Sequence, residues 1–167
     1  VQVGAAQGSG VIINKEGYVL TAAHVAGRPG QTCRIFMPDG KQLPAKTLGM
    51  SRSMDAGLIK IQLPESEEEL AELKLPFVEM SDGELLTLGH WCLALGHPGG
   101  FQLDRPPAVR LGRIVHKYKG VITTDCTLIG GDYGGPLFDM NGRVIGIHSR
   151  IGPQLVHDVN VPIKVFH

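Results

Sequence analysis

The chain has 167 residues, of which 43% are hydrophobic, enough to bury a core in one domain or in two small barrels that share an interface. Sixteen basic residues balance 16 acidic ones, so the sequence offers no electrostatic basis for binding nucleic acid or anionic lipid. There is no run of 18 apolar residues and no basic stretch ahead of an apolar one at the N-terminus. We therefore expect neither a membrane span nor a signal peptide, and the compartment stays open between cytoplasm and periplasm.

The spacing of glycine and proline predicts an all-β protein. Its 23 Gly and 11 Pro separate short runs of β-branched and apolar residues, as expected of short strands joined by turns. In chain order, we predict strands at 10–14, 18–24, 31–37, 42–50, 56–63, 90–97, 109–118, 121–126, 135–139, 143–149 and 159–165.

One segment near the middle of the chain is a candidate helix. The stretch "ESEEELAELKL", residues 65–75, carries only a short apolar stripe and is equally compatible with an acidic surface loop. It separates two strand-rich halves, which favours paired antiparallel barrels over a parallel α/β sheet. We predict a single domain in which 1–75 form the first barrel and the linker, and 76–167 form the second barrel.

The cysteines and histidines give no sign of a metal site. Cys33, Cys92 and Cys126 cannot all pair with one another and match no CxxC pattern, so buried free thiols are favoured over one disulfide. The seven histidines form no HExxH motif, and no Cys/His cluster has zinc spacing. We expect no metal.

Three stretches carry candidate chemistry. His24 ends the predicted strand in "YVLTAAHV", Asp55 precedes the apolar strand in "MDAGLIKI", and "GGDYGGPL" surrounds Tyr133. Each has an ordinary structural alternative when taken alone: a packed histidine, a turn-forming acid and a Gly-rich turn.

The order of the three stretches is more informative than any one of them. A His, then an Asp, then a GDxGGP loop is the chain order of a chymotrypsin-type triad. In such a triad the acid orients an imidazole, the imidazole takes the proton of a hydroxyl nucleophile, and the Gly-rich loop supplies an oxyanion hole.

Four stretches together resemble the trypsin-like peptidase domain of the HtrA/Deg family: "GSGVIINKEGYVLTAAHV", "MDAGLIKI", "LALGHPGG" and "GGDYGGPLFDMNGRVIGIHSRIG". The resemblance implies two perpendicular six-stranded antiparallel β-barrels, with a protein or peptide substrate bound in the cleft between them and no cofactor. His24 and Asp55 would come from the first barrel and Tyr133 from the second.

The same resemblance assigns further roles around the triad. The backbone amides of Gly131 and Tyr133 would form the oxyanion hole, and Ser149 would support Asp55 from behind. The pocket for the side chain before the scissile bond would be flanked by Thr127, Leu128, Ile129 and Gly130. With Leu128 and Ile129 in this segment and no acid at its base, we expect an apolar or small preference there.

Asp132, which precedes the nucleophile position, matches the acid that pairs with a freed N-terminal amine in trypsin-like zymogens. Val1 is the corresponding amine here. Because the HtrA/Deg group does not need that activation, we do not expect the Val1–Asp132 pair.

The chain departs from the family pattern at the nucleophile, where the family has Ser and this sequence has Tyr133. A phenol has a pKa near ~10, yet its oxygen lies several ångströms farther from the main chain than a serine oxygen and would overshoot the imidazole. We expect no PDZ domain within this chain, and the oligomeric state is open. Two functions remain: an endopeptidase domain that Tyr133 makes inactive or nearly so, and a pseudoprotease that binds extended peptides or a partner protein by strand addition. A purely structural module is a weaker third alternative.

Overall fold

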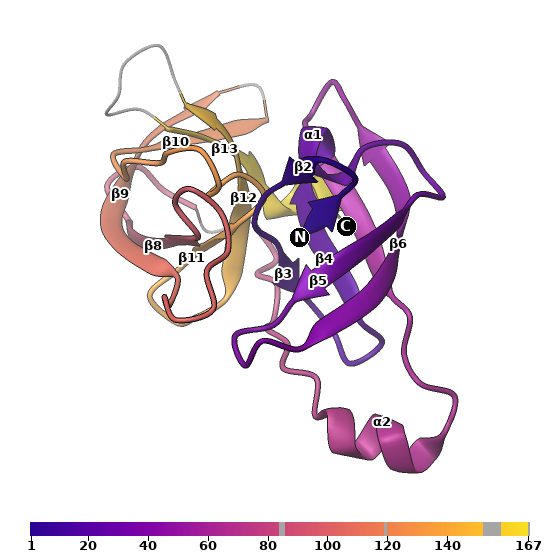
Figure 1. Ribbon diagram of the computed structural model, residues 1–167. Coiled ribbons are helices and arrows are strands. Elements are labelled where there is room, and N and C mark those ends of the chain that lie inside the picture. Colours follow the sequence, from indigo (N-terminus) through magenta and orange to yellow (C-terminus); the bar gives the residue numbers. More distant parts are fainter. Residues whose placement is uncertain (84–85, 119, 152–157, 167) are drawn as a thin grey trace.

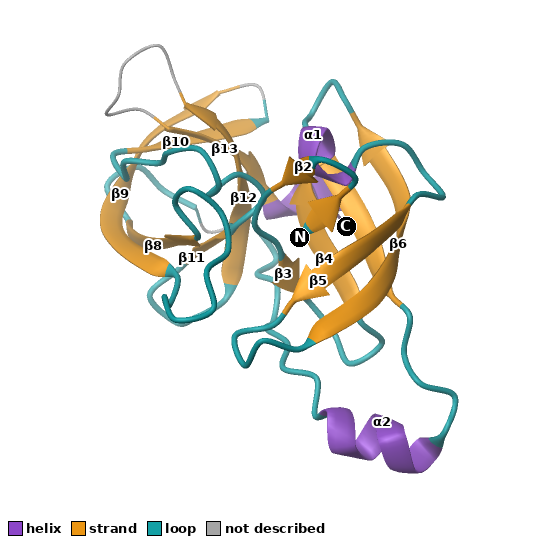
Figure 2. Cartoon of the chain, viewed as in Figure 1, coloured by secondary structure: helices purple, strands orange, loops and turns teal. Residues whose placement is uncertain are grey.

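The computed structural model describes residues 1–83, 86–118, 120–151 and 158–166. Strands dominate it, and they divide between two bodies that lie side by side (Figures 1 and 2). The N-terminal body is a curled seven-stranded sheet in the order β2-β1-β5-β6-β7-β4-β3. Its strands are β1 (Gln2–Val3), β2 (Ala6–Gln7), β3 (Val11–Ile12), β4 (Tyr18–Ala22), β5 (Thr32–Phe36), β6 (Gln42–Ser51) and β7 (Ala56–Ile61).

Alternation of side chains explains how this sheet builds a core. Along β5, Cys33 and Ile35 are buried while Thr32 and Arg34 are exposed, the two-residue period of a strand with one face in the interior. The same period buries Ala45 and Thr47 on β6. The resulting core consists of Val3, Val19, Ala26, Cys33, Ile35, Met37, Ala45, Ile59 and Ile61.

The second body is a closed barrel of six antiparallel strands in the order β10-β13-β12-β11-β8-β9. Closure pairs every strand on both sides and so leaves no open sheet edge. The strands are β8 (Trp91–Gly96), β9 (Ala108–Tyr118), β10 (Val121–Thr124), β11 (Pro136–Phe138), β12 (Val144–Ile151) and β13 (Asp158–Pro162). The barrel core contains Leu86, Cys92, Ala94, Ile114, Ile122, Cys126, Leu128, Leu137 and Ile145.

Three short helices complete the described chain: α1 (Ala23–Ala26), α2 (Glu67–Leu73) and the 3₁₀ helix η1 (Ile163–Phe166). In α2, Ser66 caps the N-terminus by accepting a hydrogen bond from Glu69 N. Acidic residues occupy the first turn, where their negative charges interact favourably with the helix dipole. The helix buries none of its residues and stands away from both bodies (Figure 1). It lies in the connection between them, where the sequence predicts a linker.

A small core joins the two bodies. Val11 and Leu20 of the first sheet pack with Val144 and Ile147 of the barrel and with Ile163 of η1. β4 lies against β12 in this region. This buried apolar joint holds β4 and β12 against each other. The residues of the candidate site lie close to it in the chain: His24 follows β4, and Ser149 belongs to β12.

The all-β, double-barrel prediction is confirmed, with local differences. The strand predicted to run to residue 24 ends at Ala22, because the chain turns into α1 at Ala23. The last strand ends at Pro162, which has no N–H to continue a ladder, and η1 follows. The first sheet also gains β1 and β2, whose two-residue strands are too short to give a periodic signal. Cys33, Cys92 and Cys126 are all buried free thiols.

Candidate active site

His24 is placed at the joint by the pairing of β4 with β7. Their ladder ends with Ala22 opposite Ala56, and Ala23 N then donates a 3.1 Å hydrogen bond to Asp55 O. This closes the end of the ladder and directs the chain into α1. His24 sits in this single turn with its side chain 47% exposed, so the imidazole is open to solvent.

Asp55 is held by hydrogen bonds from two directions. His24 Nδ1 lies 3.0 Å from both carboxylate oxygens, and His24 N donates to Oδ1 at 3.2 Å. From the barrel, Ser149 Oγ donates to Oδ2 at 2.6 Å. Asp55 has φ of +54°, a left-handed conformation that Asp tolerates better than most residues.

These contacts keep the Asp55 carboxyl ionised. Burial acts to raise the pKa of the Asp55 carboxyl, but the hydrogen bonds from His24 and Ser149 outweigh it, and the pKa is lowered. The carboxylate is therefore ionised at neutral pH. Because the Asp55 carboxylate can only accept, Nδ1 of His24 is the donor in this pair, and in the neutral imidazole Nε2 is then the acceptor.

The loop around Tyr133 presents two free main-chain donors. The N–H groups of Gly131 and Tyr133 donate to no other residue that the structure describes. Gly131 has φ of +98°, and a β-carbon there would lie 2.3 Å from His97 O, so only glycine fits this close approach. Paired unsatisfied amides of this kind can bind a developing oxyanion.

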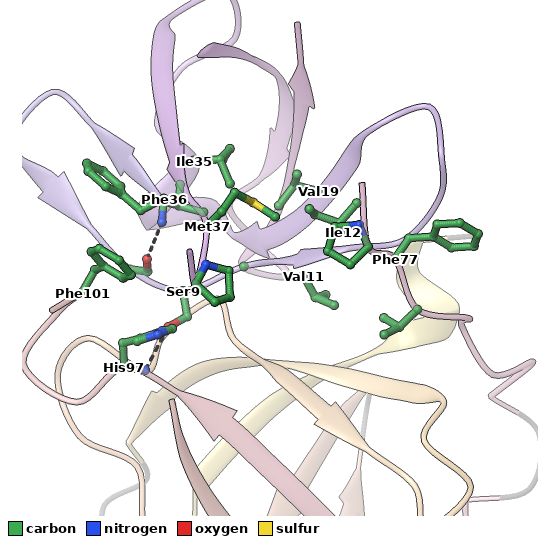
Figure 3. Close-up of a pocket in the computed structure, with 16 residues that line it drawn as sticks. Ser9, Val11, Ile12, Val19, Ile35, Phe36, Met37, Phe77, His97 and Phe101 are labelled. Atoms are coloured by element: carbon green, nitrogen blue, oxygen red, sulfur yellow. Dashed lines mark hydrogen bonds between the residues drawn. The ribbon is translucent and has the colours of Figure 1, made fainter. Parts of the chain in front are cut away.

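Ser9 ties this loop to the first sheet. Its hydroxyl donates to Gly131 O at 2.9 Å and accepts from His97 N at 3.2 Å, and its main-chain N–H donates to Tyr133 O at 2.8 Å. Ser9 and His97 lie together at the joint in Figure 3. Ser9 carries no local sequence signal, because its partners lie more than 80 residues away along the chain.

Tyr133 stands beside His24 but does not complete a triad. The two rings pack edge to face, with centroids 5.4 Å apart and planes at 72°. No hydrogen bond joins the phenol to His24 among the described residues. Burial, and then the charges of Asp158 and Asp132, raise the pKa of the Tyr133 phenol, so it is a weaker acid than free tyrosine.

The segment expected to flank the substrate pocket is only partly exposed. Thr127, Ile129 and Gly130 are exposed, whereas the Leu128 side chain is buried in the barrel core. Asp158 lies directly behind the segment, because its Oδ2 accepts a 2.6 Å hydrogen bond from Leu128 N. An acid therefore lies next to this segment, although the sequence predicts none at the base of the pocket.

Two hollows lie near these residues. A polar one of about 540 Å³ borders His24 and Asp55 and is flanked by Arg28 and Arg52. An apolar one of about 270 Å³ lies at the joint between the bodies. Here the rings of Phe36 and Phe101 pack against each other with centroids 5.4 Å apart and planes tilted by 30° (Figure 3). Neither His24, Asp55 nor Tyr133 lines the apolar hollow.

Within the described ranges there is no group of three or more His, Cys, Asp or Glu that could hold a metal ion. No helix among the same residues is long and apolar enough to cross a membrane. The absence of a metal or cofactor stays a prediction.

Two β bodies with a His–Asp pair and a Gly-rich loop at their joint define the class of chymotrypsin-like serine peptidases. The family model for a trypsin-like peptidase domain matches residues 8–147, and the chain belongs to this family. Probable periplasmic DegP-like serine endoproteases are among its relatives. One from Pseudomonas putida is 36% identical over 148 residues, 86% of this chain, and one from Chlamydia trachomatis is 34% identical over 156 residues, 88% of this chain.

Solved structures agree with this assignment. The HtrA-type protease AlgW, determined with a decapeptide, superposes with a TM-score of 0.77 at 28% identity over 95% of this chain and 48% of its own. The chain spans about 29% of the length of the two DegP-like relatives. The family match, the relatives and the superposition together identify the chain as an HtrA/DegP-type serine protease domain.

Proposed function

We propose that this domain carries the peptide-bond-hydrolysing site of an HtrA-type endopeptidase and that Tyr133 silences it. In this site His24 is the general base, Asp55 orients it, and the amides of Gly131 and Tyr133 are the oxyanion donors. Ser149 supports Asp55. The observation that carries the proposal is the His24–Asp55–Ser149 chain of hydrogen bonds beside two free loop amides.

Three features support the silencing role of Tyr133. Its ring packs against the imidazole, where a nucleophile would instead donate a hydrogen bond. Its raised pKa makes the phenolate harder to form. A nucleophile misplaced by ~1 Å already loses ~100-fold in rate, and the phenol oxygen extends well beyond the reach of a serine oxygen.

Turnover of fluorescein-labelled casein tests the proposal. We expect the chain as it stands to show no cleavage above background and Tyr133→Ser to cleave at least ~10³-fold faster, because the base, the orienting acid and the oxyanion donors are then complete. His24→Ala in the Tyr133→Ser background should abolish this activity. Cleavage by the unaltered chain that depends on His24 would contradict the proposal.

A second candidate function is peptide binding without hydrolysis. It is favoured by the likeness to an HtrA-type protease solved with a decapeptide. Fluorescence anisotropy of a labelled casein peptide separates the two. A binding module holds the peptide with Tyr133 in place, whereas a silenced peptidase binds it more tightly after Tyr133→Ala, because the ring no longer fills the space beside His24.

A further inference from the structure

Asp132 is a buried carboxylate between the two proposed oxyanion donors. Its side chain has no exposed surface, and Oδ2 accepts a 2.9 Å hydrogen bond from Ile129 N. Its main chain is also fixed, since its N–H donates to Ile129 O and its carbonyl accepts from Gly135 N. Gly96 leaves the space for the carboxylate, because a β-carbon there would lie 2.4 Å from Oδ1. A buried carboxylate is costly unless a cation pairs with it.

Arg110 of β9 supplies that cation. Its Nη2 lies 3.1 Å from Asp132 Oδ2, and its side chain is only 21% exposed. Among the ion pairs of the described residues, no other cation contacts Asp132. The N-terminal amine of Val1 donates instead to Gly8 O at 2.9 Å, so it does not take this place.

We propose that Arg110 is a positioning residue for the oxyanion hole: by neutralising Asp132 within the barrel, it fixes the Gly131 and Tyr133 amides on either side. This inference rests on the proposed function of those amides. Arg110 comes from the barrel wall, while Ser9 holds the same loop from the first sheet. The loop is thus anchored from both bodies.

The physical reason lies in the flexibility of the loop. Gly130, Gly131, Gly134 and Gly135 surround Asp132 and Tyr133, so the main chain has little intrinsic preference for one conformation. Removing Arg110 leaves an uncompensated buried charge, which is strongly unfavourable and drives the carboxylate toward solvent. Both flanking amides then move with it.

The first test uses the chain with Tyr133 present. Arg110→Met should shift and broaden the amide NMR signals of Gly131 and Tyr133, and adding Asp132→Asn should restore them, because Asn Oδ1 still accepts from Ile129 N without a charge. Arg113→Met is the matched control. Arg113 lies on the same strand and pairs with Asp125 at 3.3 Å, but both side chains are solvent-accessible at 54% and 30%. Unchanged Gly131 and Tyr133 signals in folded Arg110→Met would overturn the inference.

The second test measures kinetics in the Tyr133→Ser background. We expect Arg110→Met to lower kcat by ~10²–10³-fold, the loss typical of a missing oxyanion donor, with little change in KM. The Arg110→Met/Asp132→Asn pair should regain at least ~10-fold of it, and Arg113→Met should stay within ~3-fold of its parent. If folded Arg110→Met keeps its kcat, Arg110 has no positioning role. If Tyr133→Ser itself is inactive, the proposed function fails, and the NMR test still decides the role of Arg110.

Discussion

At the scale of single residues, Ser149 links the two bodies at the candidate site. It comes from β12 of the barrel, yet its hydroxyl donates to Asp55, which precedes β7 of the first sheet. The bond helps to keep the Asp55 carboxylate ionised and facing His24. The orientation of the imidazole therefore depends on how the two bodies are docked.

Removing this hydroxyl gives a graded prediction. In the Tyr133→Ser background, we expect Ser149→Ala to lower kcat by about 10-fold with KM nearly unchanged, because His24 loses orientation but the substrate cleft does not change. Ser53→Ala is a suitable control, since Ser53 is exposed and, among the residues that the structure describes, its hydroxyl bonds only to Ser51 Oγ. Initial rates over a range of substrate concentrations measure both constants. A kcat equal to that of the parent would show that Ser149 is not needed to orient Asp55.

At the scale of elements, β12 carries a buried histidine next to Ser149. His148 has no exposed surface, and its Nδ1 lies 2.7 Å from Asn160 Oδ1 on β13. Burial lowers the pKa of His148, and the hydrogen bond with Asn160 offsets only part of this. Between the lowered folded pKa and the ordinary value of 6.5, His148 is therefore neutral in the folded protein and protonated in the unfolded chain.

This linkage predicts a pH-dependent stability. Because the unfolded state binds the extra proton, the free energy of unfolding should fall as the pH drops below the ordinary histidine pKa of 6.5 toward the lower folded value. We expect His148→Gln to reduce this slope between pH 7.5 and pH 5.5, measured by urea unfolding at each pH. The exposed His116 provides the control, and His116→Gln should leave the slope unchanged. An unaltered slope in His148→Gln would show that protonation of His148 does not cause the pH dependence.

The elements also show what sequence patterns can reveal. Each of the eleven predicted strands has a counterpart in the structure. They could be predicted because two-residue alternation and the Gly and Pro residues between the strands are local signals. His24, Asp55 and the Gly-rich loop were found from their linear order, and the structure brings them together at one joint. α1 was missed because a single helical turn has no period of its own.

Other site residues depend on partners far away along the chain. Arg110 and Asp132 meet only through the pairing of β9 with β8 and the return of the loop beneath Gly96. The sequence did contain a weak local signal. By two-residue alternation Arg110 lies on the same face of β9 as Gly112 and Ile114, which are buried in the barrel. A single charged residue on that face needs a buried partner. Asp158 and Ser9 gave no comparable signal.

At the scale of the whole molecule, a buried apolar core joins the two bodies. The joint core combines Leu20 of the first sheet with Ile147 and Ile163 from the second half of the chain. Neither body can separate without exposing this apolar surface. Since the His24–Asp55 pair and the Gly-rich loop around Tyr133 lie on opposite sides of the joint, the geometry of the candidate site depends on the intact domain.

Substitution in this core should destabilise the entire domain. We expect Ile147→Ala to lower the free energy of unfolding by ~2–5 kcal/mol, because Ile147 is fully buried. Leu70→Ala on α2 should change it by less than ~0.5 kcal/mol, since Leu70 is 41% exposed on a helix that packs against neither body. Urea unfolding followed both by Trp91 fluorescence and by far-UV circular dichroism should give one coincident transition. Two separate transitions would show that the bodies unfold independently.

A fluorophosphonate modifies an activated serine hydroxyl. Intact-mass spectrometry after treatment with this reagent is therefore the most direct test of whether Tyr133 alone silences the site. We expect no adduct on the unaltered chain, one adduct on Tyr133→Ser, and none on Tyr133→Ser/His24→Ala. An adduct on Tyr133 itself, or a folded Tyr133→Ser chain that stays unlabelled, would contradict the proposal that this domain carries a peptidase site silenced by Tyr133.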